Sequence, residues 1–227
     1  RHQKVIEEAP APRVRQGHLA DIGERAVAAL EAMGYASLGT VETLLAKRRF
    51  AFLEVNTRLQ VEHGVTEEVT GLDLVQAQIR LAAGEPLDEV LPPEPAAQAP
   101  GRFAVQARIY AEDSRRMLPS TGALSTYRPP RLTGVRVEAG YAEGQSVTPY
   151  YDPLLAKVIG TGPTRELAIG RTLVGVKAFE IRGVATNRDL LQAILRHPDF
   201  LAGKVHTGWL EAHRKAARGP TTAPLLL

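Results

Sequence analysis

The feature that most constrains this chain is a proline-rich segment at residues 91–101, LPPEPAAQAPG. Proline lacks the backbone N–H that a helix interior or a central strand requires, so four prolines in eleven positions exclude both structures. We therefore expect a connector at 89–101 that joins an N-terminal part, 1–88, to a C-terminal part, 102–215. Residues 216–227 are expected to form a tail or linker.

The composition is that of a folded protein. Of 227 residues, 44% are apolar and 23% are charged, which argues against disorder of the whole chain. The absence of cysteine excludes disulfides, thiolate zinc sites and cysteine nucleophiles, and favours a reducing, cytoplasmic location. A net charge of +3 with scattered cations disfavours nucleic-acid binding. No apolar run reaches the ~20 residues of a membrane helix.

Residue spacing predicts a mixed α+β fold. In the N-terminal part the predicted elements are a strand over 1–9, a helix over 21–33, a hairpin of strands 38–46 and 50–56, and a helix over 73–83. Asp21 and Glu24 are interpreted as a capping pair that begins the first helix. Because the chain opens without methionine inside a strand-like run, we expect it to be a piece of a longer protein.

The C-terminal part is expected to be mostly strands followed by helices. The predicted elements are strands over 103–110, 123–128, 134–139 and 153–159, and helices over 164–180 and 187–196. Thr164 is expected to cap the first of these helices, and Pro198 to stop the second. Alternation along 103–110 predicts one apolar and one polar face.

The predicted hairpin brings two carboxylates together. If its turn is centred on Arg48, Glu42 stands directly opposite Glu54, and both side chains leave the same face. Asn56 lies two residues beyond Glu54 and shares that face. Oxygen ligands suit Mg²⁺ or Mn²⁺, with water and substrate phosphate completing the shell. At this point a solvated strand face, paired with the cations of the turn, remains the alternative.

Three further polar residues continue the same alternation beyond the carboxylates. If the chain stays extended, Arg58, Gln60 and Glu62 line up on that face. A guanidinium can hold a planar oxyanion, and a glutamate can act as a general base. A polar outer face without chemistry is the alternative.

Several long motifs carry a family resemblance. The segment FLEVNTRLQVEHGVTEEVTGLDLV resembles the metal and substrate segment of biotin carboxylases, which are ATP-grasp enzymes. The runs RHQKVIEEAPAP, ARIYAEDSRRMLPSTG, YYDPLLAKVI and EIRGVATNRDLLQAIL are similar to other parts of that family, in the same order over about 1–210. The resemblance implies the C-terminal half of an ATP-grasp domain followed by a biotin carboxylase C-terminal domain, an antiparallel sheet with helices.

The resemblance also implies an activity, the ATP- and bicarbonate-dependent carboxylation of biotin on a carrier. Glu42, Glu54 and Asn56 match the family's ligands for magnesium on the ATP phosphates. Glu62 matches the general base that deprotonates bicarbonate, and Arg58 matches the residue that holds it.

Other positions match the family's substrate contacts. Gln60 and the Val61 backbone correspond to neighbours of the bicarbonate. Arg108 corresponds to the arginine that stabilises the biotin anion. The remaining matches are two residues near the nucleotide and phosphoryl group, His2 and Lys4, and an adenine contact, Leu44.

The resemblance implies partners and leaves the final acceptor open. The partners are a biotin carboxyl carrier, a carboxyltransferase expected to act on an acyl-CoA, a second copy in a homodimer, and the N-terminal half of the enzyme, which holds the phosphate loop. Gly64 replaces the usual proline, as in some urea and acyl-CoA carboxylases, whereas Thr57 disfavours pyruvate carboxylases, which usually carry alanine. The alternative function is a non-catalytic assembly module, which would be inactive alone.

The remaining conspicuous residues are interpreted as structural. Four histidines, His18, His197, His206 and His213, show no ligand spacing in the sequence and are expected to be surface or capping groups. Trp209 is expected to anchor packing.

Overall fold

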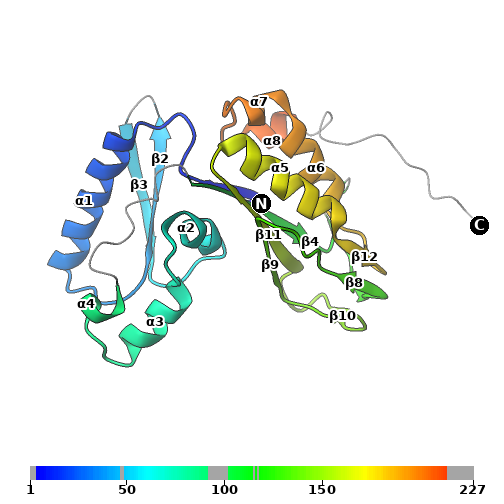
Figure 1. The fold of residues 1–227 in the computed structure, drawn as a ribbon, viewed down its shortest axis with the longest axis horizontal. Helices are drawn as coiled ribbons and strands as arrows, with labels where there is room; N and C mark the ends of the chain where they lie inside the picture. The colour runs from blue at the N-terminus through cyan, green and yellow to red at the C-terminus, as the bar shows by residue number, and fades with distance from the viewer. Residues whose placement is uncertain (1–3, 47–48, 92–101, 115, 117, 214–227) are drawn as a thin grey trace, which may run out of the picture. The chain divides into compact units, whose positions relative to one another are not determined.

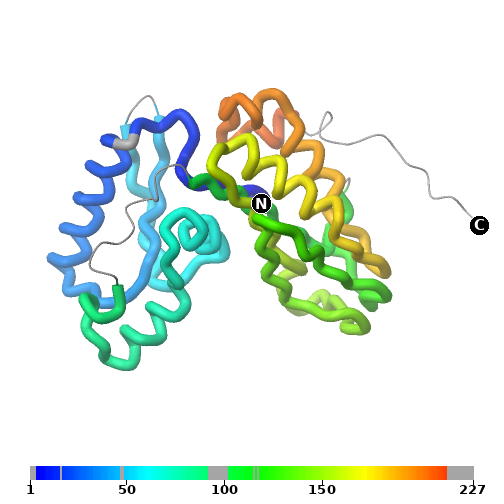
Figure 2. The backbone as a smooth tube through the Cα atoms, in the orientation of Figure 1, coloured from blue at the N-terminus to red at the C-terminus, as the bar shows by residue number. Residues whose placement is uncertain are grey.

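The computed structural model describes residues 4–46, 49–91, 102–114, 116 and 118–213. The chain forms two compact units. The hairpin unit spans Ala9–Arg102, and the sheet unit combines the residues up to Glu8 with those from Phe103 onward. Figure 2 shows the N-terminal segment running beside the strand that begins after the connector. The division into 1–88 and 102–215 remains a prediction, and most of its connector lies outside the described residues.

Within its described residues, the hairpin unit contains one strand pair and four helices (Figure 1). They are α1 (Gln16–Ala32), β2 (Thr40–Ala46), β3 (Arg49–Asn56), α2 (His63–Thr70), α3 (Leu74–Ala82) and α4 (Leu87–Val90). The expected helix at 73–83 is confirmed as α3. It begins after Asp73, whose side chain caps the helix by accepting a hydrogen bond from the Gln76 N–H at 2.8 Å. Gly84 follows it with φ +90°, a conformation that glycine adopts without strain.

The first helix begins five residues earlier than its sequence indicates. Asp21 lies inside α1 and pairs with Arg25 at 3.1 Å, so its interpretation as a capping residue is wrong. The helix starts after Arg15 without any side-chain cap. Asp21 and Arg25 instead form the i, i+4 pair that is common on exposed helix surfaces.

A four-stranded sheet organises the sheet unit, in the order β1-β4-β11-β9. Its strands are β1 (Ile6–Ala9), β4 (Phe103–Tyr110), β9 (Val135–Ala139) and β11 (Leu154–Gly162). Two helices, α5 (Arg165–Ala178) and α6 (Arg188–Arg196), lie side by side, and α5 packs on β4 and β11 (Figure 1). Thr164 caps α5 by accepting from the Leu167 N–H at 3.2 Å, as expected.

Short elements complete this unit around the sheet. Three antiparallel strand pairs are β5 (Glu112–Asp113) with β6 (Leu118–Pro119), β7 (Gly122–Ala123) with β10 (Ser146–Val147), and β8 (Thr126–Arg128) with β12 (Glu180–Arg182). Two helical turns follow α6, namely α7 (Pro198–Leu201) and α8 (Trp209–Ala212). Trp209 is 4% exposed and packs in the core with residues of α5 and α6, which confirms its packing role. Among the described residues, no helix is both long and apolar enough to span a bilayer.

Both faces of β4 are covered, which the alternation alone did not indicate. Ala107 and Ile109 pack in the core with residues of α5. The opposite, polar face is also buried, since Gln106 is fully inaccessible and Arg108 is 8% exposed. Buried polar side chains require partners, and those on this face are described below.

Tyr127 ties β8 to the sheet and predicts a fall in stability at high pH. Its buried hydroxyl donates to the Leu155 carbonyl at 2.8 Å, and burial, helped by Tyr141, raises its pKa to about 12. An unfolded tyrosine ionises near pH 10, so between roughly pH 10 and 12 only the unfolded state releases this proton. Stability is therefore lost as the pH rises through that window, by on the order of 2–3 kcal/mol for this group.

Denaturant unfolding of the wild type and of Tyr127→Phe at pH 8 and at pH 11.5 measures this effect. The phenylalanine variant is expected to be about 1 kcal/mol less stable at pH 8 because it lacks the hydrogen bond. It should lose less stability than the wild type between pH 8 and pH 11.5. Equal losses in the two proteins would contradict the raised pKa of Tyr127 as the cause.

Candidate functional site

The hairpin places the two predicted carboxylates opposite each other. β2 and β3 are antiparallel, and Glu42 is the partner of Glu54, as the spacing predicts. A bulge follows, because Thr43 pairs with Phe52 and Leu53 is the extra residue. The predicted register is therefore right at the carboxylates and wrong by one residue toward the turn, whose centre at Arg48 lies outside the described residues.

Amide groups join the two carboxylates into one cluster. The Asn56 Nδ2 donates to Glu42 Oε1 at 3.3 Å and to Glu54 Oε1 at 3.1 Å. The Gln60 Nε2 donates to the same Glu42 oxygen at 3.0 Å. The structure thus brings together the three residues predicted to bind a metal and adds Gln60 as a residue that orients Glu42.

The donor set of this cluster fits a hard divalent cation. Glu42, Glu54 and Asn56 offer only oxygen ligands, the preference of Mg²⁺ and Mn²⁺. The asparagine now turns its N–H₂ toward the carboxylates, which is the expected response of an amide beside two anions. Rotation of the amide about its terminal torsion exchanges nitrogen and oxygen and turns Oδ1 to the same point. Glu54 is exposed, so water and phosphate can reach the carboxylates.

The segment after the hairpin does not stay extended, which corrects the prediction for Arg58, Gln60 and Glu62. β3 ends at Asn56, and the chain turns so that the Gln60 carbonyl accepts from the His63 N–H at 3.2 Å. Gln60 is buried, whereas Arg58 is exposed and its Nη1 donates to the Leu59 carbonyl at 3.2 Å. The three side chains therefore do not form one strand face.

A short helix, α2, explains the turn and was not predicted. Glu62 is the residue immediately before it and is half-buried. Val65 and Val69 form its buried stripe, and Gly71 ends it with φ +75°. Their i, i+4 spacing before a glycine is the sequence signal that could have revealed the helix.

Gly64 occupies the first turn of this helix and is buried. Its φ is not in the positive region, so Gly64 does not use the left-handed conformation that glycine adopts without strain. The first turn of a helix also accepts proline, because the N–H groups there have no intrahelical partner.

In the sheet unit, the site candidate Arg108 lies in a buried ion pair. Its Nη2 lies 2.7 Å from Glu7 Oε1, and both side chains are about one-tenth exposed. The second Glu7 oxygen accepts from Gln106 Nε2 at 2.8 Å. Burial disfavours the charged guanidinium, but Glu7 and the Tyr110 hydroxyl outweigh it and raise the pKa of Arg108. Arg108 is thus a permanent, oriented cation.

Arg108 belongs to a charged row that crosses the sheet. Its cross-strand partner on β11 is Lys157, whose own partner on β9 is Glu138. Lys157 forms an ion pair with Glu138. Two cations side by side in a sheet repel, so the glutamates at both ends offset the repulsion. The sequence did not indicate this row, because it depends on the pairing of four strands.

The backbone at Arg108 is held from outside the sheet by Asn187. Its Nδ2 donates to the Arg108 carbonyl at 3.0 Å, and its Oδ1 accepts from the Tyr110 N–H at 2.9 Å. Asn187 is 1% exposed and lies directly before α6. The start of that helix therefore fixes β4 where Arg108 leaves it.

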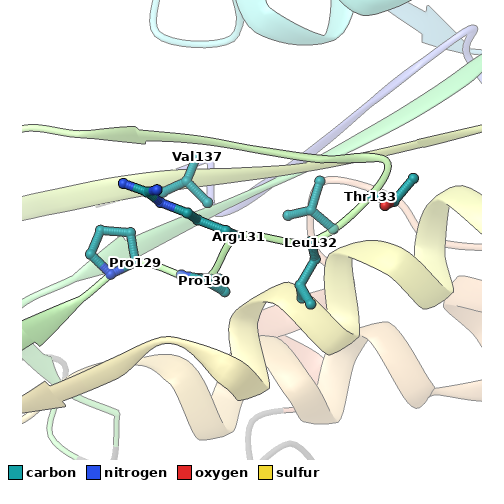
Figure 3. Close-up of a pocket in the computed structure, with 7 residues that line it drawn as sticks. Pro129, Pro130, Arg131, Leu132, Thr133 and Val137 are labelled. Carbon is teal, nitrogen blue, oxygen red and sulfur yellow. The ribbon is translucent and has the colours of Figure 1, made fainter.

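The remaining predicted contacts are less well defined. Leu44 is exposed on β2, Lys4 is exposed, and Val61 lies in the turn before α2. His2 lies outside the described residues. A surface hollow in the sheet unit is lined by residues 129–133, Val135 and Val137, and contains none of the predicted site residues (Figure 3).

Two family models together match most of the chain. The ATP binding domain of the carbamoyl-phosphate synthase L chain matches residues 1–90, and the biotin carboxylase C-terminal domain matches residues 106–212. The hairpin cluster lies in the first match and Arg108 in the second.

Curated relatives agree with these models. The chain is 44% identical to a biotin carboxylase of Halalkalibacterium halodurans over 96% of its length and 48% of the relative. It is 43% identical to the mitochondrial methylcrotonoyl-CoA carboxylase subunit alpha of Arabidopsis thaliana, over 94% of this chain and 29% of that one. The chain therefore spans about half the length, or less, of the curated relatives that it matches.

Solved structures show the same fold. The biotin carboxylase domain of a thermophilic 2-oxoglutarate carboxylase, bound to bicarbonate, superposes with a TM-score of 0.89 at 37% identity, over 97% of this chain and 49% of that one. The biotin carboxylase subunit of a pyruvate carboxylase gives a TM-score of 0.89 at 38% identity, over the same shares of the two chains.

Proposed function

The chain belongs to the biotin carboxylase family, and we propose that it supplies part of the site at which ATP and bicarbonate carboxylate biotin. The observation that carries the proposal is the cluster of Glu42, Glu54 and Asn56, joined by hydrogen bonds on one hairpin. These residues would hold Mg²⁺ or Mn²⁺, which supplies neutralising charge for the ATP phosphates.

The residues after the hairpin would handle bicarbonate. Bicarbonate is a weak nucleophile that must lose its proton before it attacks the γ-phosphate. We assign Glu62 as the base that accepts this proton, and Arg58, with Gln60 and the Val61 backbone, as the groups that orient the anion. Gln60 also holds Glu42, so it would couple the bicarbonate position to the metal ligands.

Arg108 would act on biotin. The ureido nitrogen of biotin is a poor nucleophile unless the negative charge that develops on the neighbouring oxygen is stabilised. A guanidinium that Glu7 orients and that stays charged is suited to this task. Lys4, His2 and Leu44 are assigned to the nucleotide by the family match alone.

The partners follow from the same proposal. Biotin would arrive on a carrier protein or domain, and a carboxyltransferase would use the product. An acyl-CoA is the favoured acceptor because relatives include methylcrotonoyl-CoA and propionyl-CoA carboxylases. A place in fatty acid biosynthesis, in the cytoplasm, would suit such an acceptor. A homodimer is also proposed, since one of the matching structures is described as a dimer.

The N-terminal half of the enzyme is the remaining proposed partner. Large apolar side chains on the hairpin are exposed, with Leu44, Leu45, Phe52 and Leu53 each 42–65% accessible. Such a patch on a small unit marks an interaction surface. Because this half would also carry the phosphate loop, the 227-residue chain is expected to be inactive alone. A urea or pyruvate carboxylase, or a non-catalytic assembly module, is the alternative function.

The test is ADP release by the complete protein that contains this chain, with Mg²⁺, ATP, bicarbonate and free biotin. ADP release is expected to require both bicarbonate and biotin. Glu54→Gln should raise the Mg²⁺ concentration needed for half-maximal rate by about tenfold or more, because one of two anionic ligands is removed.

Glu85→Gln is the matched control. Glu85 is a surface carboxylate of the same unit, paired with Arg80 at 2.6 Å, and its substitution should leave the Mg²⁺ dependence unchanged. ADP release that ignores biotin and bicarbonate would refute the proposed reaction, whereas an unchanged Mg²⁺ dependence in Glu54→Gln would refute the assigned ligand.

A further inference from the structure

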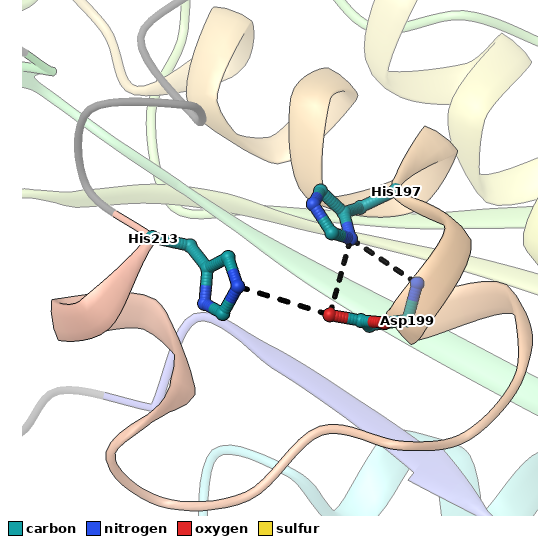
Figure 4. A group of neighbouring side chains, drawn as sticks. All are labelled: His197, Asp199 and His213. Atoms are coloured by element: carbon teal, nitrogen blue, oxygen red, sulfur yellow. Dashed lines mark hydrogen bonds and ion pairs between the residues drawn. The ribbon is translucent and has the colours of Figure 1, made fainter.

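Three side chains near the end of the described chain converge on one point (Figure 4). His197 precedes α7, Asp199 lies within α7, and His213 follows α8. The Nδ1 of His197 and the Nε2 of His213 each lie 3.8 Å from Asp199 Oδ2. One potential ligand atom from each residue lies within 4.8 Å of the other two. His197 caps α7, as expected, by accepting from the Asp199 N–H. The absence of ligand spacing in the sequence did not reveal this cluster, because two helical turns bring His213 close to His197.

Hydrogen bonds determine which ring nitrogens carry lone pairs. The Nδ1 of His213 lies 2.8 Å from the Trp209 carbonyl, which can only accept, so this nitrogen carries the proton. The Nε2 of a neutral His213 then presents its lone pair to Asp199. The Nδ1 of His197 accepts from the Asp199 N–H at 3.1 Å, so this nitrogen also carries a lone pair, which a cation could take over from that N–H. Two nitrogen lone pairs and an anionic oxygen facing one another attract a cation.

Packing holds these groups in place. The buried Trp209 donates from Nε1 to Asp199 Oδ2 at 3.0 Å and stacks on His213, with centroids 4.6 Å apart and planes at 17°. His197 contacts the same indole edge-on at 4.7 Å. An imidazole fixed by a carbonyl and a carboxylate fixed by an N–H are the arrangement found behind metal ligands.

We propose that His197, Asp199 and His213 form a binding site for a transition-metal dication of the Zn²⁺ class, which fastens α7 to α8. Two imidazoles and one carboxylate are a mixed nitrogen and oxygen set, which suits Zn²⁺ rather than Mg²⁺. Tetrahedral ligands about 2.0–2.1 Å from zinc lie about 3.4 Å apart, so side-chain movements of about 1 Å close the site. Coordination by His197 replaces its single bond to the Asp199 N–H, and water completes the shell. The site does not depend on the proposed function.

The chain contains a reporter for this site, because Trp209 is its single tryptophan. Zn²⁺ titration by calorimetry and Co²⁺ titration followed by Trp209 fluorescence, both on the 227-residue chain at pH 7.5, test the proposal. One ion per chain, quenching by Co²⁺ and competition between the two metals are expected.

Three variants decide whether the named ligands are responsible. Asp199→Asn keeps an acceptor for the Trp209 indole but removes the charge, and His213→Gln removes one nitrogen ligand, so both should abolish saturable binding. His206→Gln is the control, since His206 lies in the loop between α7 and α8 but outside the cluster, and it should bind as the wild type does. Absence of saturable binding in the wild type would overturn the proposal, as would equal binding by all variants.

Discussion

Replacement of Glu62 by glutamine in the complete protein is expected to lower biotin-dependent ADP release by about 10²- to 10⁴-fold, the usual contribution of a positioned general base. Glutamine has nearly the same shape but cannot accept the bicarbonate proton. Because Glu62 precedes α2 and its side chain does not cap that helix, the fold should survive the change. Initial rates at saturating ATP, with the ATP affinity measured separately, give the result.

Glu68→Gln makes the same chemical change six residues along the chain, within α2. It should retain activity close to that of the wild type. An equal loss in both variants would indicate that charge near α2, and not a base at Glu62, supports the reaction. Full activity of Glu62→Gln would show that Glu62 is not the base. The assigned metal ligands would still be tested separately, by the Mg²⁺ dependence of Glu54→Gln.

Gly160→Ala is expected to destabilise the sheet unit by about 3 kcal/mol or more, with a melting temperature lower by on the order of 10 °C. Gly160 lies in β11 where α5 crosses it. An added Cβ would lie 2.4 Å from the Thr172 backbone nitrogen and 2.5 Å from the Ala168 carbonyl oxygen. Neither is the flexible end of a side chain, so strand and helix must separate. The Gly160 N–H would also lose its 3.1 Å bond to the Thr172 hydroxyl.

Gly170→Ala provides the matched control within the same pair of elements. Gly170 lies in the interior of α5, and a Cβ there meets no atom within 4 Å. Alanine is the better helix former, so this variant should be more stable by up to about 1 kcal/mol. Thermal unfolding of both variants by circular dichroism tests the pair, and similar melting temperatures would count against close contact of α5 with β11.

The metal-binding candidates were predictable from sequence because they depend on local geometry. Cross-strand partners in a hairpin follow from its turn, and alternate residues share a face, so residue spacing was enough to group Glu42, Glu54 and Asn56. The later bulge changed the register only toward the turn. The prediction that Arg58, Gln60 and Glu62 share one strand face was wrong, because strand alternation was extended beyond Asn56, where β3 ends.

The amino-acid sequence by itself determined the α+β class, the longer strands and helices, and the family, because period, proline and long motifs act over short distances along the chain. Only the tertiary structure decided how Glu7, Gln106 and Arg108 meet, since Glu7 and Gln106 are 99 residues apart and their contact requires β1 to join the sheet beside β4. The convergence of His197 and His213 was likewise a result of folding, as the turns between them bring both rings against one indole. Pairing and packing between distant segments depend on the free energy of the whole unit, so residue spacing along the chain does not predict them.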